Sequence, residues 1–427
     1  MGRDWFVHLR AVRALVAVLL TASSVATASA AELRVLSTRP QPELMGYING
    51  ELIPKFEAEH GVRVTFEFAT WDERVDKLLI SIAAGVPYDI VFTGFYSPYE
   101  EGSSGLLAPL DGYLERWGNF QRYPAPLWET QKWGGRIYTV PIEVQLRGVG
   151  YNVELFARAG LDPNAPPQSW DEILAYTRLL THLGDGAAVV QRGFNVPTSG
   201  GGAAQNAWWW MRQAGITEID AGGTRSNLDR PEALEALEFL VDLHEAALTD
   251  IPGAGGGLGG GRVAMASLTP DNYRNIIEAD ANMIGTIDVF APRYDRSKEP
   301  VAHAFVNGLA ITAASTQKDD AWRFIEALLD DDSLANIQRA MGWVSGRPDL
   351  IADLTAAYPG MDMFLEIMPY VYGSVIPPPR NVSQQEFATY LTRMFNRQIS
   401  PQEALVQTHA IWNRLLGEWN AQLGLQQ

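Results

Sequence analysis

The sequence of 427 residues contains no cysteine. This absence excludes a disulfide framework, a thiolate nucleophile, a zinc finger, an iron–sulfur cluster and a lipid anchor on cysteine. Basic residues are also scarce, because 33 Lys and Arg stand against 50 Asp and Glu, for a formal net charge of −17. Nucleic-acid binding needs a basic surface that displaces counterions from phosphates. The composition therefore argues against a nucleic-acid partner.

The motifs of common enzyme and cofactor classes are missing or incomplete. There is no P-loop and no G-x-S-x-G elbow, and His244, although followed by glutamate, lacks the second histidine of a zinc protease. The glycine-rich run at 253–262 satisfies G-x-G-x-x-G, but it precedes the strand-like segment 263–267 instead of opening a helix. We interpret this run as a loop. The sequence predicts no catalytic residue, no metal site and no cofactor.

The rest of the composition is typical of a globular protein. Hydrophobic residues make up 47% of the sequence and aromatic residues 10%, which is enough to form a large core. Since a domain usually takes about 100 to 200 residues, this length predicts two domains or more.

The N-terminus has the pattern of a cleavable export signal. Arg3, Arg10 and Arg13 precede an uncharged stretch at 14–31, which contains the A-x-A site at 28–30. An uncleaved membrane anchor is the alternative, but Ser and Thr residues dilute the stretch. We predict a signal peptide at 1–30. Its removal takes away three basic residues and one acidic residue, which changes the net charge from −17 to −19. Without a cysteine the product is not a lipoprotein, and we expect it in the periplasm.

After this segment, the hydrophobic periodicity alternates between strands and helices. Leu44, Ile48, Leu52 and Phe56 recur every four residues, as on one face of a helix, whereas the segment 62–68 alternates apolar and polar residues. The order of elements is strand 33–36, helix 44–56, strand 62–68, helix 75–82 and strand 90–92. Such an order predicts βαβ units around a parallel sheet.

Capping signals predict where several helices begin. Capping boxes occur at Thr70 with Glu73, at Ser169 with Glu172 and at Ser400 with Glu403, and Pro231 and Pro401 have the position of a first helical residue. Helix patterns cover 173–180, 234–243, 321–329 and 404–416, and strand-like runs cover 263–267 and 305–312. Two extended pieces, 138–143 and 146–151, flank Gln145. The sequence therefore predicts an α/β fold in two lobes.

Aromatic residues form a surplus near the expected ends of strands and helices, where open α/β sheets bind ligands. They are Trp71, Phe95, Tyr96, Trp208, Trp209, Trp210, Tyr273, Trp343 and Tyr372. Aromatic rings that stack on the apolar face of a sugar, together with polar side chains around its hydroxyl groups, would suit a carbohydrate. The alternative is that most of these rings are core. Three successive tryptophans on a helix point about 100° apart, so they cannot share one pocket wall.

The order and spacing of several segments resemble a known family. The segments are LIPKFEAEHGVRV, KLLISIAAGVPYDIVF, SSGLLAPLD, GRIYTVPIEVQLRGVGYN, EALEALEFLVDLHE, GRVAMAS, VNGLAITAAS and ISPQEALVQTHAIWNRLL. Together they resemble bacterial extracellular solute-binding proteins of carbohydrate ABC transporters, the maltose-binding-protein-like group, over nearly the whole chain after the signal peptide.

The resemblance implies the type II periplasmic-binding-protein fold, in which two α/β lobes are joined by crossover strands and the ligand lies in a cleft between them. Crossings are then expected near 141–145, 305–307 and 346–355. The first lobe would hold residues 31–143 and about 307–350. The second would hold 144–306 and about 351–427.

The resemblance also implies a set of ligand-binding residues. Those expected from the first lobe and the crossovers are Thr38, Arg39, Trp71, Asp72, Thr93, Phe95, Tyr96, Glu143, Gln145 and Asn307. Those expected from the second lobe are Gln205, Trp208, Thr269, Asp271 and Tyr273, with Trp343, Arg347, Tyr372 and Arg380 as further candidates. Maltose-binding members carry carboxylates where this chain has Tyr96 and Gln145, and tryptophan where it has Asp271. These departures argue against maltose itself.

The function that follows is that of a monomeric periplasmic receptor, which closes around a carbohydrate or polyol and delivers it to a membrane permease. The net charge favours a neutral ligand. Arg39, Arg347 or Arg380 could locally reverse that preference for a phosphorylated or sulfonated sugar.

Two alternatives remain open. One is a binding protein of the same architecture for a polyamine or another small solute, which would use acidic and aromatic side chains together. The other is a secreted glycoside hydrolase, for which Asp72, Glu143 and Asp271 are the carboxylates to consider. No hydrolase pattern accompanies them.

Overall fold

The computed structural model describes residues 31–254 and 257–424. The predicted signal peptide at 1–30 lies outside these residues. By its internal contacts the chain divides into two compact units. Among the described residues, the first comprises 31–144, Val306–Leu354 and Gln422–Gly424, and the second comprises Gln145–Phe305 and Thr355–Ala421.

A sheet with the order β2-β1-β3-β11 forms the centre of the first unit. Its strands are β1 (Glu32–Ser37), β2 (Arg63–Phe68), β3 (Ile90–Thr93) and the later part of β11 (Ala302–Ile311). β1 runs parallel to both β2 and β3, which confirms the predicted parallel arrangement, whereas β11 is antiparallel to β3. Because parallel strands end at one edge, the loops that follow β1, β2 and β3 lie at the same edge of this sheet.

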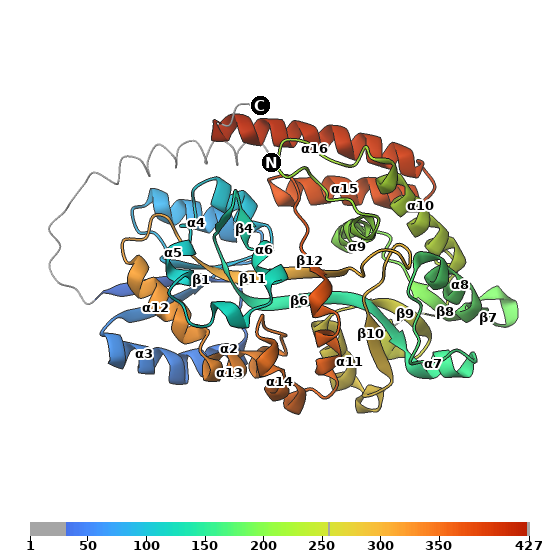
Figure 1. Ribbon diagram of the computed structural model, residues 1–427, viewed down its shortest axis with the longest axis horizontal. Coiled ribbons are helices and arrows are strands. Elements are labelled where there is room, and N and C mark those ends of the chain that lie inside the picture. The colour runs from blue at the N-terminus through green and yellow to red at the C-terminus, as the bar shows by residue number, and fades with distance from the viewer. Residues whose placement is uncertain (1–30, 255–256, 425–427) are drawn as a thin grey trace. The chain divides into compact units, whose positions relative to one another are not determined.

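Helices cover both faces of this sheet, with α4 on one face and α2, α3, α12 and α13 on the other (Figure 1). The helices of the unit are α2 (Pro42–Tyr47), α3 (Ile53–His60), α4 (Arg74–Ala83), α5 (Asp111–Leu114), α6 (Ala125–Glu129), α12 (Lys318–Leu328) and α13 (Asp331–Met341). A short hairpin joins β4 (Lys132–Trp133) to β5 (Arg136–Ile137). The helix predicted at 44–56 is present with a π-helical turn at Ile48–Leu52, and its four periodic residues are all buried in the core.

In the second unit, β9 lies between β6 and β8. Its strands are β6 (Val140–Asn152, from residue 145 on), β7 (His182–Leu183), β8 (Val189–Asn195), β9 (Val263–Leu268), β10 (Ile287–Phe290) and β12 (Val371–Tyr372). β8 is parallel to β9, and β6 is antiparallel to both β9 and β10. The prediction of two extended pieces around Gln145 was wrong in one respect, because a single unbroken strand, β6, passes through that residue.

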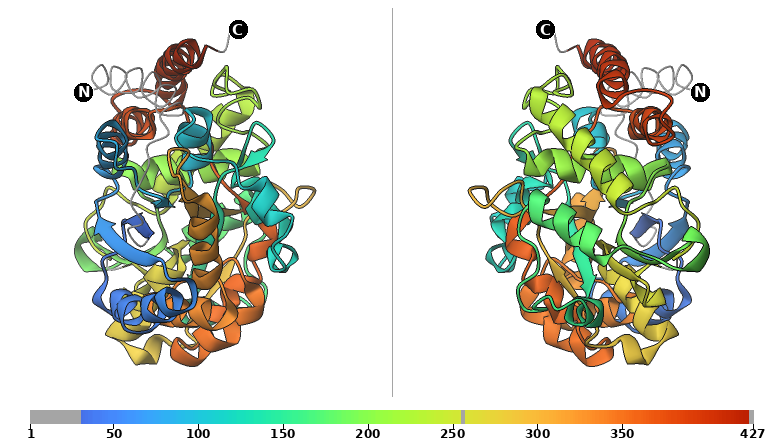
Figure 2. Two further views of the ribbon diagram at one scale, coloured as in Figure 1. Left: turned by 90° about the vertical axis from the view of Figure 1, so that its left-hand side faces the viewer. Right: turned by 90° about the vertical axis from the view of Figure 1, so that its right-hand side faces the viewer.

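Figure 1 shows α9 and α10 on one side of β6 and α11 on the other. The remaining helices are α7 (Val153–Arg158), α8 (Trp170–Leu180), α9 (Gly200–Gln213), α10 (Pro231–Ala246), α11 (Pro270–Ala279), α14 (Ile351–Ala357), α15 (Arg380–Phe395) and α16 (Pro401–Leu423). Figures 1 and 2 show α15 and α16 side by side, and the indole N–H of Trp412 on α16 donates to the carbonyl of Ser383 on α15 at 3.1 Å.

The predicted capping signals are confirmed. The Thr70 hydroxyl accepts from the backbone N–H of Glu73, whose carboxylate accepts from the N–H of Thr70 in return. The hydroxyl groups of Ser169 and Ser400 accept from the N–H three residues later, and Pro231 is the first residue of α10. These bonds satisfy N–H groups that have no partner inside the helix.

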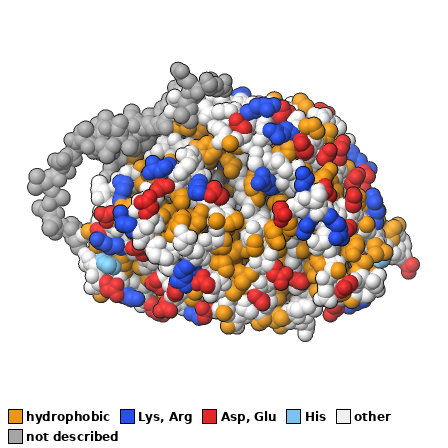
Figure 3. All heavy atoms as spheres, in the orientation of Figure 1, with side chains coloured by type: hydrophobic (Ala, Val, Ile, Leu, Met, Phe, Trp, Pro, Cys, Tyr) orange, Lys and Arg blue, Asp and Glu red, His pale blue; other side chains and the backbone are white. Residues whose placement is uncertain are grey.

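Charged side chains of both signs are scattered among hydrophobic side chains on the face shown in Figure 3, with no broad area of a single sign on that face. Within residues 31–254 and 257–424, no helix combines the length and apolar character needed to cross a bilayer.

Candidate functional site

In the first unit, the candidate site centres on the carboxylate of Glu143. The Arg39 guanidinium donates to Glu143 Oε2 at 2.6 Å, and the Asn307 side-chain amide donates to the same oxygen at 2.9 Å. The Glu143 side chain is only 1% exposed and that of Arg39 14%. A carboxylate buried this deeply needs such compensation, and the two donors provide it.

Three aromatic rings surround the Arg39 guanidinium. Its central carbon lies 5.3 Å from the ring centroid of Trp71, 5.3 Å from that of Phe92 and 5.0 Å from that of Trp343. These distances are within the range of cation–π attraction. A cavity of about 30 Å³ beside Arg39, also lined by Ser37, Phe92 and Trp343, has room for a water molecule rather than a sugar ring. Arg39 is therefore fixed in place by its surroundings.

A buried ion pair supports the loop after β3, which carries Phe95 and Tyr96. Arg74 donates to both carboxylate oxygens of Glu101, and the Ser97 hydroxyl donates to Glu101 at 2.6 Å. Both charged side chains are fully buried. Burial acts to lower the pKa of Arg74, but the attraction of Glu101 outweighs it and the pKa is raised. The loop is thus attached to the start of α4.

In the second unit, Gln145 and Asp271 lie together. The Gln145 amide donates to Asp271 Oδ2 at 3.2 Å. Asp271 has this position because Thr269 caps α11, accepting from the N–H of Asn272, which places Asp271 in the first turn. The structure therefore brings these two predicted residues into contact.

Arg147 follows Gln145 on the same face of β6, since side chains two residues apart on a strand share a face. It was missed by the sequence analysis, although the alternation of Glu143, Gln145 and Arg147 could have pointed to it. It donates to Gln205 Oε1 at 3.0 Å, and its guanidinium lies 5.2 Å from the ring centroid of Phe305. Desolvation lowers the pKa of Arg147 to about 10, so the group stays charged at neutral pH.

The hydroxyl group of Tyr372 is engaged within the second unit, where it donates to Glu218. The N–H of Val375 donates to the same carboxylate oxygen at 3.3 Å. Burial raises the pKa of Glu218, and burial likewise raises that of Tyr372. Beside them, His303 Nε2 lies 2.8 Å from the Ser374 hydroxyl, and burial holds the pKa of His303 well below its usual value. His303 is therefore neutral at pH 7.

Several other candidates belong to the interior. Trp208, Trp209 and Trp210 have no exposed surface, which confirms the core alternative for this run. Tyr273 is fully buried and donates to the carbonyl of Pro359 at 2.8 Å, while the Thr93 hydroxyl donates to the carbonyl of Gly308 at 2.9 Å. Trp208 has no surface for a ligand to reach, and the hydroxyl groups of Tyr273 and Thr93 already donate to backbone carbonyls. We therefore leave these three residues out of the ligand set proposed below.

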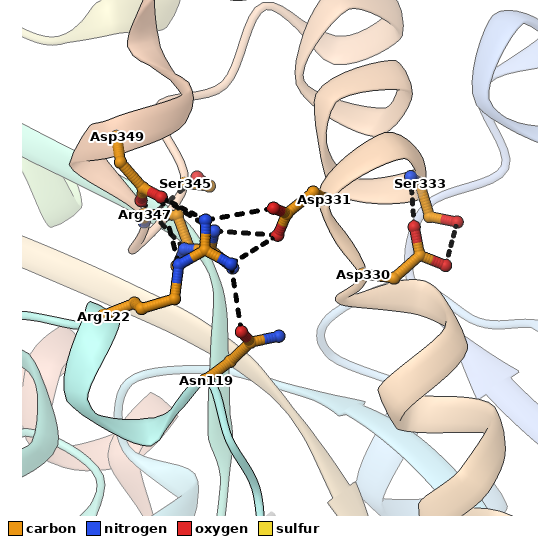
Figure 4. A network of polar contacts seen from close by, with 8 residues as sticks. All are labelled: Asn119, Arg122, Asp330, Asp331, Ser333, Ser345, Arg347 and Asp349. Carbon is orange, nitrogen blue, oxygen red and sulfur yellow. Dashed lines mark hydrogen bonds and ion pairs between the residues drawn. The ribbon is translucent and has the colours of Figure 1, made fainter.

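Arg347 also has a structural role. Its side chain is fully buried, and it donates to Asp331 at 2.9 Å and to Asp349 at 2.9 Å. Figure 4 shows that Arg122 joins the same two carboxylates and also contacts Asn119. The network attaches the segment after Gly346 to the start of α13, and we also leave Arg347 out of the ligand set.

The remaining candidates keep exposed surface. Asp72 is exposed, whereas the others are half-buried: Trp71, Phe95, Gln145, Gln205, Asp271, Tyr372 and Arg380. Thr38, Tyr96, Glu143, Thr269, Asn307 and Trp343 are buried beside them in their respective units. Within the described part of the chain, no cluster of three His, Asp or Glu residues could hold a metal ion.

Comparison with known families assigns the class of the protein. The family model for bacterial extracellular solute-binding proteins matches residues 40–335, more than half of the chain. The protein belongs to this family of solute-binding proteins. A putative binding protein of Brucella abortus (strain 2308) is 25% identical over 329 residues, which are 74% of this chain and 77% of that protein. The putrescine-binding periplasmic protein PotF of Escherichia coli (strain K12) is 30% identical over 129 residues, 30% of this chain and 34% of that protein.

Solved structures confirm the predicted fold. The sugar-binding protein MalE of Xanthomonas citri superposes with a TM-score of 0.77 at 18% identity, over 93% of this chain and all of that one. The cyclic alpha-maltosyl-1,6-maltose binding protein of Arthrobacter globiformis gives 0.76 at 21% identity, over 91% and 99%. The chain therefore has the α/β fold of type II periplasmic binding proteins.

Proposed function

We propose that this protein is the substrate-binding component of an ABC transporter that imports a carbohydrate or polyol. Family membership supports a solute receptor, and the kinds of side chain at the candidate site support a hydroxyl-rich solute. In the first unit Trp71 is a half-buried aromatic side chain, and in the second unit Gln145, Gln205 and Asp271 are half-buried hydrogen-bonding side chains. These kinds of side chain suit the apolar faces and the hydroxyl rim of a sugar. The observation that carries the proposal is the hydrogen bond between Gln145 and Asp271, which places two polar side chains together at the start of α11.

Receptors of this kind work by population shift. A solute that binds one conformation of the two-unit chain more tightly than another favours that conformation by its differential affinity. We propose that a membrane permease recognises the ligand-favoured conformation. We also propose that the protein acts as a monomer in the periplasm, after cleavage of the segment 1–30.

The same carboxylates argue against a glycosidase. In the first unit Glu143 is held by Arg39 and Asn307, and in the second Asp271 accepts from Gln145. A general acid needs access to the leaving group, but the Glu143 side chain is only 1% exposed and already accepts from Arg39 and Asn307. We propose that the protein is not an enzyme. Release of reducing sugar by the purified chain would contradict this.

The polyamine alternative has two observations in its favour. The segment similar to PotF covers 30% of this chain, and the overall charge is negative. Putrescine and spermidine should therefore be included in any ligand screen.

Differential scanning fluorimetry on the mature chain 31–427 tests the proposal. Maltose, D-tagatose, D-glucose, D-galactose, ribitol and their acidic derivatives form the first panel, and putrescine and spermidine form the second. Ligand at 100 times its dissociation constant adds about 2.7 kcal/mol to the unfolding free energy, which is an easily measured shift. A shift with polyamines alone, and none with any sugar, sugar acid or polyol, would overturn the carbohydrate proposal.

A further inference from the structure

A groove of about 560 Å³ lies within the second unit, where α11, the ends of β8 and β9 and the turn Leu258–Gly260 meet. Its volume is within the range of about 300–1,000 Å³ that is usual for small-molecule sites. None of the residues that line it belongs to the ligand set of the candidate site. The groove is therefore large enough for a solute and has no ligand assigned to it.

The buried part of the lining is apolar. Ala266 and Leu268 on β9 and Leu258 in the turn before β9 are all buried. This turn belongs to the glycine-rich run at 253–262, and the position that a Cβ atom of Gly259 would occupy lies 3.0 Å from Ile276 Cγ1 on α11. A side chain would be tight there, so glycine allows the turn to pack against α11. The turn and the helix thus form adjoining walls of the groove.

Three exposed asparagine side chains supply hydrogen-bonding groups along the groove. Within the described residues, the side-chain amides of Asn195 and Asn275 make no hydrogen bond to the protein. The Asn272 oxygen accepts from the Thr269 hydroxyl at 2.9 Å, which leaves its NH₂ group for another partner. A side-chain amide offers two donors and an acceptor. It therefore matches a hydroxyl group, which also donates and accepts.

The charge of the lining favours a neutral solute. Among the described residues that line the groove, Asp280 is the only charged one. Its Oδ1 already accepts from the backbone N–H of Asn282 at 3.0 Å and from the side-chain amide of the same residue at 2.8 Å. Without an arginine or lysine the groove has no counter-charge for a carboxylate or phosphate, and one partly engaged carboxylate is a poor partner for the several ammonium groups of a polyamine.

The groove extends along α11 from the candidate residue Asp271. Asn275 follows Asp271 by four residues, so the two side chains are neighbours on the helix surface. Ala279 lines the groove one turn further on, and the helix rises ~12 Å from Asp271 to Ala279 at about 1.5 Å per residue. A solute that contacts Asp271 and also fills the groove is therefore longer than one sugar ring.

We infer that this groove is a subsite for a neutral sugar ring, so that the solute is an oligosaccharide of two or more rings. One ring binds at the Gln145–Asp271 pair, and the next lies along α11, where Asn275 and Asn272 bind its hydroxyl groups. This inference rests on the proposed function and narrows it, since a single sugar or a linear polyol would leave the groove unused.

Isothermal titration of the mature chain 31–427 with sugars of increasing length tests the inference. The monosaccharides are D-glucose, D-mannose, D-galactose and D-xylose. Their disaccharides are maltose and cellobiose, mannobiose, galactobiose and xylobiose, and ribitol represents the polyols. We expect at least one disaccharide to bind at least 10-fold more tightly than its monosaccharide. A smaller difference in every series would overturn the inference.

Two variants assign the effect to the groove. Asn275→Ala removes an amide and should reduce affinity for the preferred disaccharide at least 5-fold. Its melting temperature should stay the same or rise, because alanine favours a helix more than asparagine does, so a loss of affinity there does not come from a loss of structure. Ala279→Trp fills the far end of the groove and should reduce the same affinity at least 10-fold.

The matched control is Gln385→Ala. Gln385 is an exposed carboxamide on α15 of the same unit and does not line the groove. This variant removes a similar group from a helix surface and should leave the affinity for every sugar unchanged. All three variants should leave the affinity for the monosaccharide within 3-fold of that of the parent chain, since the ring at Asp271 does not contact them.

Failure of the inference and failure of the proposed function give different results. If a sugar binds but either Asn275→Ala or Ala279→Trp leaves the affinity for the preferred disaccharide unchanged, the subsite is wrong while the carbohydrate receptor stands. If no sugar or polyol binds at all, the proposed function itself is wrong and the inference falls with it.

Discussion

Arg39 donates a hydrogen bond of 2.6 Å to Glu143 and so joins the loop after β1 to strand β6. Asn307 on β11 donates to the same oxygen at 2.9 Å. The chain leaves the first unit after Val144, one residue beyond Glu143, and enters it again at Val306, one residue before Asn307. One carboxylate therefore connects a candidate ligand loop to two of the chain crossings, which gives it a positioning role.

Replacing Glu143 with Gln should destabilise the first unit. The substitution keeps the shape but removes the negative charge that compensates Arg39, whose side chain is 14% exposed. A hydrogen bond to a charged group contributes roughly 1.5–3 kcal/mol, so we expect a loss of about 2 kcal/mol in the free energy of unfolding. Urea denaturation measures it. Glu154→Gln is the control, since its pair with Arg158 is exposed and should change stability by less than about 1 kcal/mol. Equal effects of the two substitutions would contradict the positioning role.

The buried Arg74–Glu101 pair should be more sensitive still. Glu101→Gln leaves a fully buried guanidinium without its counter-charge, and breaking a buried pair in this way costs about 3–5 kcal/mol. The double variant Arg74→Met with Glu101→Leu removes both charges and should recover much of that loss. Thermal unfolding of the two variants compares them. If the double variant is less stable than Glu101→Gln, the prediction is wrong, and the ion pair stabilises the folded chain by more than the neutralisation of its two charges.

Much of the fold could be predicted from local patterns. The capping boxes at Thr70 and Ser169 could be predicted because each depends on two residues three positions apart. The helix at 44–56 could be predicted because its apolar residues share one face. The continuity of β6 through Gln145 could not be read, because one polar residue in a strand resembles a break. The later part of β6 pairs with β9 at residues 148–151 and with β10 at residues 149–152, and local sequence does not show such pairing between distant segments.

The candidate site was less predictable, because its roles depend on contacts between distant segments. The local sequence does not distinguish Arg39 and Arg347 from Arg147. In the structure, however, Arg39 is neutralised by Glu143, which is 104 residues away. Arg347 is neutralised by Asp349 and Asp331, which are 2 and 16 residues away. Nothing in the neighbouring sequence shows that the side chain of Arg147, within the described residues, donates a hydrogen bond to a glutamine and not to a carboxylate. Charge balance at a site is a property of tertiary packing.

Trp71 and Trp208 should respond differently to replacement by alanine. Trp208 has no exposed surface, so Trp208→Ala should cost about 3–5 kcal/mol through the cavity it leaves. Trp71 is half-buried beside Arg39, so its replacement should mainly reduce ligand affinity, by 10-fold or more, with a smaller loss of stability. Denaturation and titration calorimetry on both variants separate the effects. Unchanged affinity in Trp71→Ala would remove Trp71 from the ligand set.

Asp349 should give the protein part of its sensitivity to acid. Hydrogen bonding to Arg347, followed by that to Arg122, lowers the pKa of Asp349 from 3.8 to about 2. Because the pKa is lower in the folded state than in the unfolded state, the network stabilises the fold above about pH 4 and this contribution is lost as the pH falls toward 2. The side chain is 43% exposed, so after screening we expect about 1 kcal/mol at most.

Asp349→Asn should therefore lower stability at pH 7 and leave it nearly unchanged at pH 2, so that the curve of unfolding free energy against pH becomes flatter between pH 4 and pH 2. Urea titrations at half-unit pH intervals measure this slope. Asp332→Asn on α13 is the control, because Asp332 is an exposed carboxylate near the same network. If Asp349→Asn gives the same slope of unfolding free energy against pH as the parent chain and the Asp332→Asn control, the prediction is wrong. The ion pairs of Arg347 would then hold the segment after Gly346 without contributing to stability in acid.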